Sequence, residues 1–138
     1  STVTLAAAGD AVVGVVIGFL PDPTNLNISG QYRAASTNRY CWVCDDPGTV
    51  FEVETTNGTL GAVDVGLNIN HAVGSPSTTT AMSGASVDAG TKATTATLTF
   101  KILDFSSRID NDDTAASAKV YVKINNHQFN SGTGSAGV

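Results

Sequence analysis

The chain has 138 residues, the usual length of a single domain that folds without disulfide or metal cross-links. Its net charge is −5 and its 7 basic residues are dispersed, so the sequence offers no basic stripe for a nucleic-acid backbone. The longest apolar run, residues 11–20, is too short to span a bilayer, and no basic segment precedes it. We therefore expect a protein made in the cytoplasm, with Ser1 exposed by removal of an initiator Met.

The composition favours strands and turns over helices. Gly occurs 14 times, Thr, Ser, Val and Ala are abundant, and good helix formers such as Met, which occurs once, are scarce. With no internal repeat and no linker, we expect an all-β, single-domain protein, either an antiparallel β-sandwich or a small β-barrel.

The N-terminal region is expected to form an arm followed by a strand. In residues 1–10, polar Thr2 and Thr4 alternate with apolar Val3 and Leu5, a pattern that allows an extended arm to add a strand to a neighbouring protein. Residues 11–20 are rich in Val and predict a buried strand, which the two prolines that follow would end.

The central region predicts a hairpin and an alternating strand. Residues 39–45 and 49–55 are expected to be two strands joined by a tight turn at Asp46-Pro47-Gly48, with Trp42 in the core of this hairpin. Residues 63–69 alternate strictly between apolar and polar or small residues, which indicates a half-buried strand.

The C-terminal region predicts a long loop followed by a pair of strands. Residues 71–95 contain few bulky side chains and predict a loop with at most a short strand at 79–82. Residues 97–105 and 119–125 alternate clearly, the second with Val120, Val122 and Ile124 facing inward. Residues 11–130 would then form the β domain, and 131–138 a flexible Gly/Ser tail.

Cys41 and Cys44 are interpreted as small buried hydrophobic residues. On a strand, residues three apart point to opposite faces and their Cα atoms lie about 10 Å apart. A disulfide tolerates at most about 7 Å, and a zinc site would need a second pair of ligands that the sequence does not supply.

The other candidate chemistry is equally unspecific. Asp110-Asn111-Asp112-Asp113 resembles the start of a calcium loop, but the later Gly and Glu that such a loop needs are missing, so a solvated turn is expected. Asp45-Asp46 before Pro47 is expected to form a turn with an Asx-type hydrogen bond, in preference to a carboxylate pair for acid/base chemistry. His71 and His127 are interpreted as ordinary strand-end histidines, and nothing marks a nucleophile. We predict no catalytic site, no metal site and no cofactor.

A series of segments, taken together, resembles the capsid decoration (cement) proteins and other small head proteins of tailed bacteriophages. The series spans residues 12–127. Its members are VVIGFLPDPTNL at 15–26, YRAASTNRY at 32–40, VCDDP at 43–47, FEV at 51–53, DVGLN at 64–68, GSPSTTT at 74–80, SG at 83–84 and VYVKINNH at 120–127. Two features depart from the pattern: the cysteines at 41 and 44, and the stretch after Phe129, which carries no motif.

The resemblance implies a virion structural protein on the capsid exterior, present in many copies and stabilising the shell by binding only its assembled form. The implied partners are the phage major capsid protein and further copies of the chain, as a trimer in preference to a dimer. Neither nucleic acid nor membrane is implied. The arm residues Thr2, Val3, Thr4 and Leu5 are the expected interface.

An alternative function is a carbohydrate-binding or adhesive β-sandwich module of a tail fibre or surface protein. Trp42, Tyr32, Tyr40 and Tyr121 would supply its stacking platform. A small hydrolase would need a nucleophile and a base that the sequence does not reveal.

Overall fold

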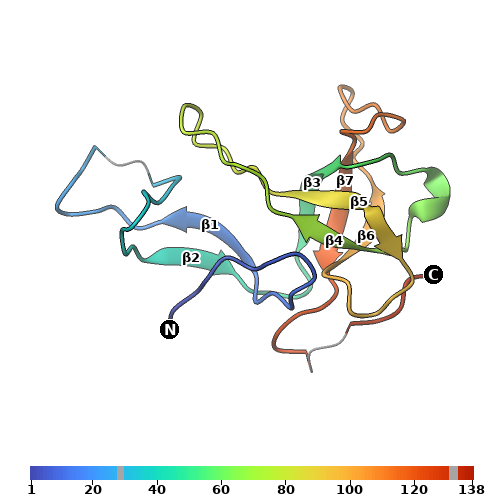
Figure 1. The fold of residues 1–138 in the computed structure, drawn as a ribbon, viewed down its shortest axis with the longest axis horizontal. Helices are drawn as coiled ribbons and strands as arrows, with labels where there is room; N and C mark the ends of the chain where they lie inside the picture. Colours follow the sequence, from blue (N-terminus) through green and yellow to red (C-terminus); the bar gives the residue numbers. More distant parts are fainter. Residues whose placement is uncertain (28–29, 131–133) are drawn as a thin grey trace.

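The structure is a computed structural model that describes residues 1–27, 30–130 and 134–138. Its described residues form seven β-strands and a short 3-10 helix, arranged as a small sheet and a barrel (Figure 1). The elements are β1 (Val15–Phe19), β2 (Cys41–Cys44), β3 (Val50–Thr56), η1 (Ala62–Asp64), β4 (Asn68–Ala72), β5 (Ser86–Ala93), β6 (Phe100–Phe105) and β7 (Lys119–Ile124).

Five strands form a closed barrel in the order β3-β5-β4-β6-β7, and β3 pairs with β7 to complete it. The prediction of an all-β small barrel is therefore confirmed. The expected antiparallel pairing holds for every barrel pair except β3–β5, which is a short parallel seam with Thr55 opposite Val87 and Thr56 opposite Asp88. Closure leaves no free strand edge among these five described strands.

The hydrophobic core fills the inside of the barrel. As predicted, Val120, Val122 and Ile124 of β7 point inward and are at most 4% exposed. In a barrel this small, branched side chains fill the interior completely, and each one contributes about 1.5–3 kcal/mol by leaving water. The other buried members of the cluster are Leu60, Ile69, Val87, Ala89 and Ile102.

β1 and β2 form a separate two-stranded antiparallel sheet that extends away from the barrel (Figure 1). The predicted hairpin of β2 and β3 is therefore wrong. The turn itself forms, because Asp46 Oδ1 accepts a hydrogen bond from Gly48 N at 2.7 Å, but β3 then enters the barrel while β2 pairs with β1.

The small sheet is joined to the barrel at His127, which is 1% exposed. Its Nε2 donates to the Asp45 carbonyl at 2.9 Å, and its Nδ1 accepts from Phe129 N at 3.1 Å, so one neutral tautomer satisfies both contacts. Beside it, Val12 forms a parallel bridge with His127, and Gly14 passes so close to Cys44 that a Cβ there would lie 2.2 Å from the Cys44 carbonyl oxygen. The segment before β1 and the segment after β2 are thus both held at this place.

Two segments differ from the sequence prediction within the barrel. The sequence predicts one strand over residues 63–69, but their first residues belong to the helix η1, and Val63 is 89% exposed. The predicted loop at 71–95 is wrong as well, because it contains the end of β4 and all of β5. Backbone pairing to β4 and β3 holds β5 in place despite its small side chains.

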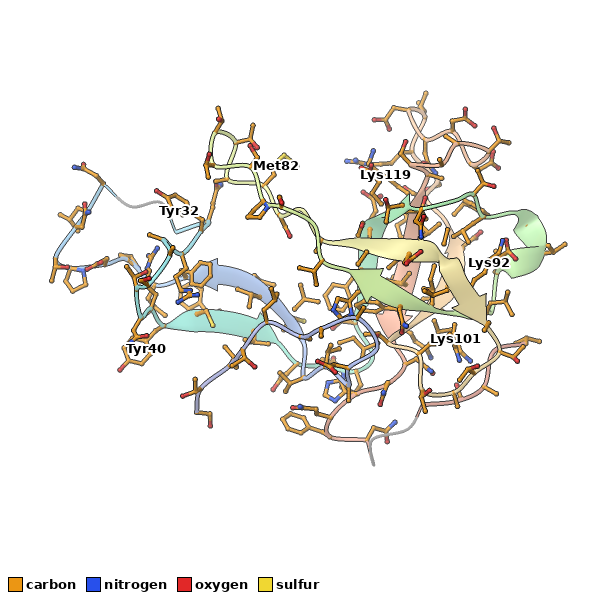
Figure 2. All side chains as sticks on the ribbon, viewed as in Figure 1. Tyr32, Tyr40, Met82, Lys92, Lys101 and Lys119 are labelled. Carbon is orange, nitrogen blue, oxygen red and sulfur yellow. The ribbon has the colours of Figure 1, made fainter. Side chains whose placement is uncertain are left out.

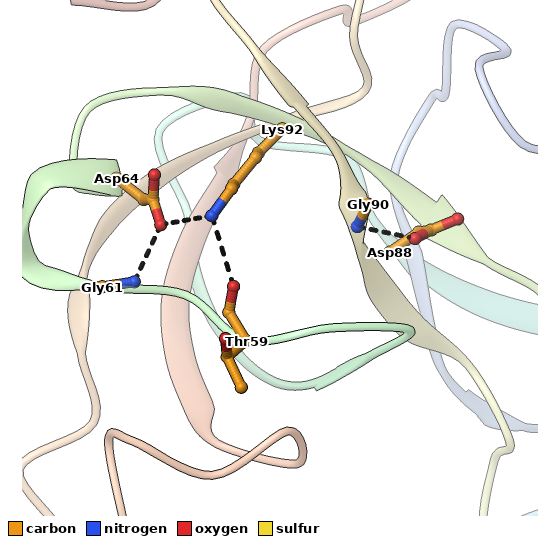
Figure 3. Close-up of polar contacts among 6 residues, drawn as sticks. All are labelled: Thr59, Gly61, Asp64, Asp88, Gly90 and Lys92. Atoms are coloured by element: carbon orange, nitrogen blue, oxygen red, sulfur yellow. Dashed lines mark hydrogen bonds and ion pairs between the residues drawn. The ribbon is translucent and has the colours of Figure 1, made fainter.

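Asp64 anchors η1 to β5 (Figure 3). Its Oδ2 accepts from Gly61 N at 2.8 Å and from Lys92 Nζ at 2.7 Å, and Lys92 also reaches the Thr59 carbonyl. The hydrogen bond from Lys92 lowers the pKa of Asp64, while burial opposes the effect. This buried carboxylate is therefore satisfied by the fold itself.

The C-terminal segment packs on the barrel. The sequence predicts a flexible tail at 131–138, of which 131–133 lie outside the described residues. Residues 134–138 are instead held: the buried Asn68 donates to the Ser135 carbonyl at 2.8 Å, and Val138 N donates to the Gly66 carbonyl at 3.1 Å. The predicted loose tail is thus not observed at residues 134–138.

Candidate interaction surface

Exposed hydrophobic side chains concentrate on the small sheet and its connecting loop. Single exposed hydrophobic residues are normal on any protein, but a concentration of them marks a place where another molecule binds. Of the sixteen large hydrophobic residues exposed in the described chain, seven fall between residues 16 and 42: Val16, Ile17, Leu20, Leu26, Tyr32, Tyr40 and Trp42.

Two aromatic side chains lie together on one face of this sheet. Side chains alternate along a strand, so Tyr40 and Trp42, two residues apart, point the same way. Gly18 lies opposite Trp42 and has no side chain to cover the indole. One pair further along, Leu20 N donates to the Tyr40 carbonyl at 2.9 Å. Tyr40 is 84% and Trp42 60% exposed. We call Leu20, Tyr40 and Trp42 the aromatic face.

The sequence prediction for this region is wrong in burial. Residues 11–20 are predicted to form a buried strand, yet Ile17 in β1 is 68% exposed, and Trp42 is exposed where the prediction puts it in a hairpin core. β1 and β2 pair only with each other among the described residues, and Val16, Ile17 and Trp42 remain exposed on them. The signal that sequence reasoning missed is the spacing of Tyr40 and Trp42, which puts both rings on one face.

Arg39 fixes the loop between the two strands. Its guanidinium lies 5.5 Å from the centre of the Phe19 ring and donates to the carbonyls of Tyr32 and Leu20. In the same loop, the Thr24 hydroxyl and backbone amide lower the pKa of Asp22 by hydrogen bonding to its carboxylate. The loop therefore has polar contacts of its own, although much of its apolar surface is open.

The four aromatic residues of the predicted stacking platform do not come together. Figure 2 shows Tyr32 and Tyr40 on opposite sides of the two strands. Tyr121 lies on β7 of the barrel, where hydrogen bonds with the Ser106 and Ser107 side chains lower its pKa. Only the pair of Tyr40 and Trp42 remains as a shared aromatic surface.

The second half of the predicted arm contacts the barrel. Val3 is 46% and Leu5 83% exposed, and residues 1–5 form no strand. From Ala6 onward the chain is fixed to the barrel, because the Ala6 carbonyl contacts His71 Nε2 at 3.1 Å and Thr99 Oγ1 donates to the Asp10 carbonyl at 3.3 Å. Thr2, Val3, Thr4 and Leu5 are therefore accessible, and their role as an interface stays a prediction.

The remaining candidate residues occupy structural positions. Cys41 and Cys44 are free thiols on β2 and are half-buried. His71 lies within β4 and His127 just after β7. Within 110–113 the chain turns, and the Thr114 hydroxyl bonds to Asp112 and lowers its pKa, as expected for a solvated turn.

The described residues contain no group of three or more His, Cys, Asp or Glu side chains that could hold a metal ion. Among the hollows of the described surface, one open hollow is lined by residues 54–56 and 83–86 and another by residues 20–24 and 38–40. Neither hollow has a histidine or a cysteine among the described residues of its wall. Across residues 1–27, 30–130 and 134–138, no helix is long and apolar enough to cross a membrane. The exposed surface of the small sheet, not a cavity, is thus the best-developed candidate site.

Comparison with known proteins found no match. No protein-family model matches the chain, and neither a curated protein nor a solved structure matches it.

Proposed function

We propose that the chain is a virion structural protein that binds the outer surface of a phage capsid and stabilises the assembled shell. The observation that carries the proposal is a closed, well-packed barrel from which an uncovered apolar sheet and an accessible N-terminal arm extend. Such surfaces suit contact with other proteins better than binding of a small molecule, which needs a deep pocket. The resemblance of the segment series to phage cement proteins supports the same function.

Stabilisation follows from mass action. A protein that binds the assembled shell but not its dissociated subunits lowers the free energy of the shell alone, and the effect sums over many equivalent sites. The arm suits this role, since Val3 and Leu5 can be buried against a coat-protein strand edge while the backbone of residues 2–5 pairs with it.

The test is co-sedimentation with phage heads that lack the protein. Purified protein should pellet with the heads and raise the temperature at which they release their DNA. Leu5→Asp should weaken pelleting, because it places a charge in the proposed contact. Ile109→Asp is the matched control, since Ile109 is 106% exposed on a barrel loop and should pellet like the wild type. Absence of pelleting by the wild type would refute the proposal.

A second candidate function is carbohydrate binding. The observation that favours it is the exposed pair of Tyr40 and Trp42, because aromatic faces commonly stack on sugar rings. A glycan array decides this point: a ligand whose binding is lost in Trp42→Ala would favour an adhesive module, and an array without binders would remove it.

A further inference from the structure

We propose that Asn57 is a site of spontaneous deamidation, and that the carboxylate formed there faces Asp88 and loosens the parallel seam between β3 and β5. The reaction is a property of the isolated chain. It goes beyond the proposed function, since it needs neither a shell nor a partner. It limits how long a folded copy keeps its barrel closed.

Asn57 and Gly58 form the bend that follows β3, and both are exposed. Asparagine is a thermolabile residue type, and Asn57 is the only one of the ten asparagines that precedes a glycine. Glycine has no side chain to hinder its own amide nitrogen from approaching the preceding side chain. No hydrogen bond among the described residues uses Gly58 N as a donor, so this nitrogen is available for reaction. By contrast, Asn68, Asn125 and Asn126 are at most 6% exposed.

The reaction consumes only water. Hydroxide takes the proton of Gly58 N, the nitrogen attacks Cγ of Asn57 to form a C–N bond, and the side-chain amide takes up a proton and leaves as ammonia. Water then opens the resulting five-membered imide at either carbonyl. One opening gives aspartate, whose carboxylate replaces the amide. The other gives isoaspartate, in which the backbone runs through the side chain and is one methylene longer.

In the folded chain the Asn57 side chain is bonded to β5. Its Nδ2 donates to Asp88 Oδ1 at 3.0 Å. The same oxygen accepts from Gly90 N at 2.9 Å (Figure 3). An ionised carboxylate only accepts hydrogen bonds, so aspartate at position 57 loses this contact with Asp88 and places a second negative charge beside it. Deamidation therefore replaces an attraction by a repulsion.

The affected contact adjoins a short pairing of the barrel. β3 and β5 are joined at two residue pairs, Thr55 with Val87 and Thr56 with Asp88, whereas β3 and β7 are joined at five. Asp88 thus belongs both to the seam and to the contact with Asn57. Repulsion at Asp88 acts on one of the two pairs that join β3 to β5.

Incubation of the purified full chain at mildly alkaline pH tests the reaction. Peptide mass spectrometry should show the mass shift of an amide-to-acid conversion at Asn57 earlier than at any other asparagine, with both aspartate and isoaspartate as products. Asn57→Gln is the control, because its longer side chain must close a six-membered ring, which is much slower. That position should keep its amide over the same period.

Asn57→Asp represents the aspartate product and tests its effect on the seam. The variant should melt at a lower temperature than the wild type, and amide hydrogen exchange should become faster at Thr56 and Val87. Added salt should reduce the difference, because exposed charges are screened. Adding Asp88→Asn exchanges donor and acceptor, so the double variant should recover most of the lost melting temperature. The single Asp88→Asn variant completes the cycle, and circular dichroism establishes that each variant folds.

The proposal is wrong if Asn57 keeps its amide while other asparagines convert, or if no asparagine converts. It is equally wrong if Asn57→Asp melts like the wild type at low salt, or if Asp88→Asn does not recover the loss. None of these measurements involves phage heads, so this inference and the proposed function can fail independently.

Discussion

Replacing His127 by Ala should destabilise the protein by about 3–4 kcal/mol. The ring is 1% exposed and makes two hydrogen bonds, to the Asp45 carbonyl at 2.9 Å and from Phe129 N at 3.1 Å. Each bond contributes about 1 kcal/mol net. The cavity left by the ring adds about 1–2 kcal/mol, less than the roughly 2–5 kcal/mol for removing a large apolar side chain from a core, since neighbouring loops can partly collapse into it.

Urea unfolding followed by far-UV circular dichroism measures this change. His71→Ala is the control: His71 is half-buried, and its ring contacts the Ala6 carbonyl at 3.1 Å, Thr99 Oγ1 at 3.5 Å and the Phe100 ring. Its expected cost is about 1–2 kcal/mol. His127→Gln should recover part of the loss, because its amide can donate toward the Asp45 carbonyl. If His127→Ala costs no more than His71→Ala, the assignment of His127 as the junction between sheet and barrel is wrong.

Three further substitutions test other contacts. Asp64→Asn should cost about 1–3 kcal/mol at neutral pH through the lost charged hydrogen bond with Lys92. Because the folded pKa of Asp64 is lowered, this stabilisation is present above the unfolded pKa of about 4 and is lost as the pH falls through the folded pKa, so urea titrations of variant and wild type should converge once the pH lies below the folded pKa. Gly14→Ala should lower the melting temperature strongly, since its Cβ would lie 2.2 Å from a backbone oxygen, whereas Gly18→Ala, with 3.8 Å to its nearest neighbour, should change it little; equal effects would contradict the described approach of the chains. Cys44→Val should cost less than about 1 kcal/mol, as measured by thermal unfolding, because volume is nearly conserved and only a 3.4 Å contact of the thiol is lost.

The barrel could be predicted from sequence where apolar alternation coincides with full burial of one face. β7 is the clearest case, because Val120, Val122 and Ile124 face a closed core and the intervening residues face outward. The same alternation at 63–69 gave a wrong prediction of a strand. Asp64 accepts hydrogen bonds from Gly61 N and Lys92, and these contacts favour a helical turn. Alternation shows only the periodicity of apolar residues, whereas a local polar contact can favour a different backbone conformation.

β5 and the candidate surface were missed for a different reason. The sequence of β5 contains only one bulky apolar residue, Val87, and its strand conformation depends on pairing with β4 and β3, which are distant in the chain. The exposure of Trp42 depends likewise on β2 pairing with β1 and not with β3. Tertiary pairing decides both outcomes, and residue patterns within a short window do not contain it.

The pairing of β3 with β7 has a consequence for synthesis of the protein. Residues 50–54 must wait for residues 119–123 before their outer hydrogen bonds can form, and the other side of β3 is joined to β5 at only two residue pairs. The barrel therefore cannot close until almost the whole chain has left the ribosome. Contacts of such high sequence separation fold slowly, on the millisecond-to-second scale. During that time β3 is an open edge in a crowded cell, so the yield of folded protein should depend on how quickly the last strand arrives.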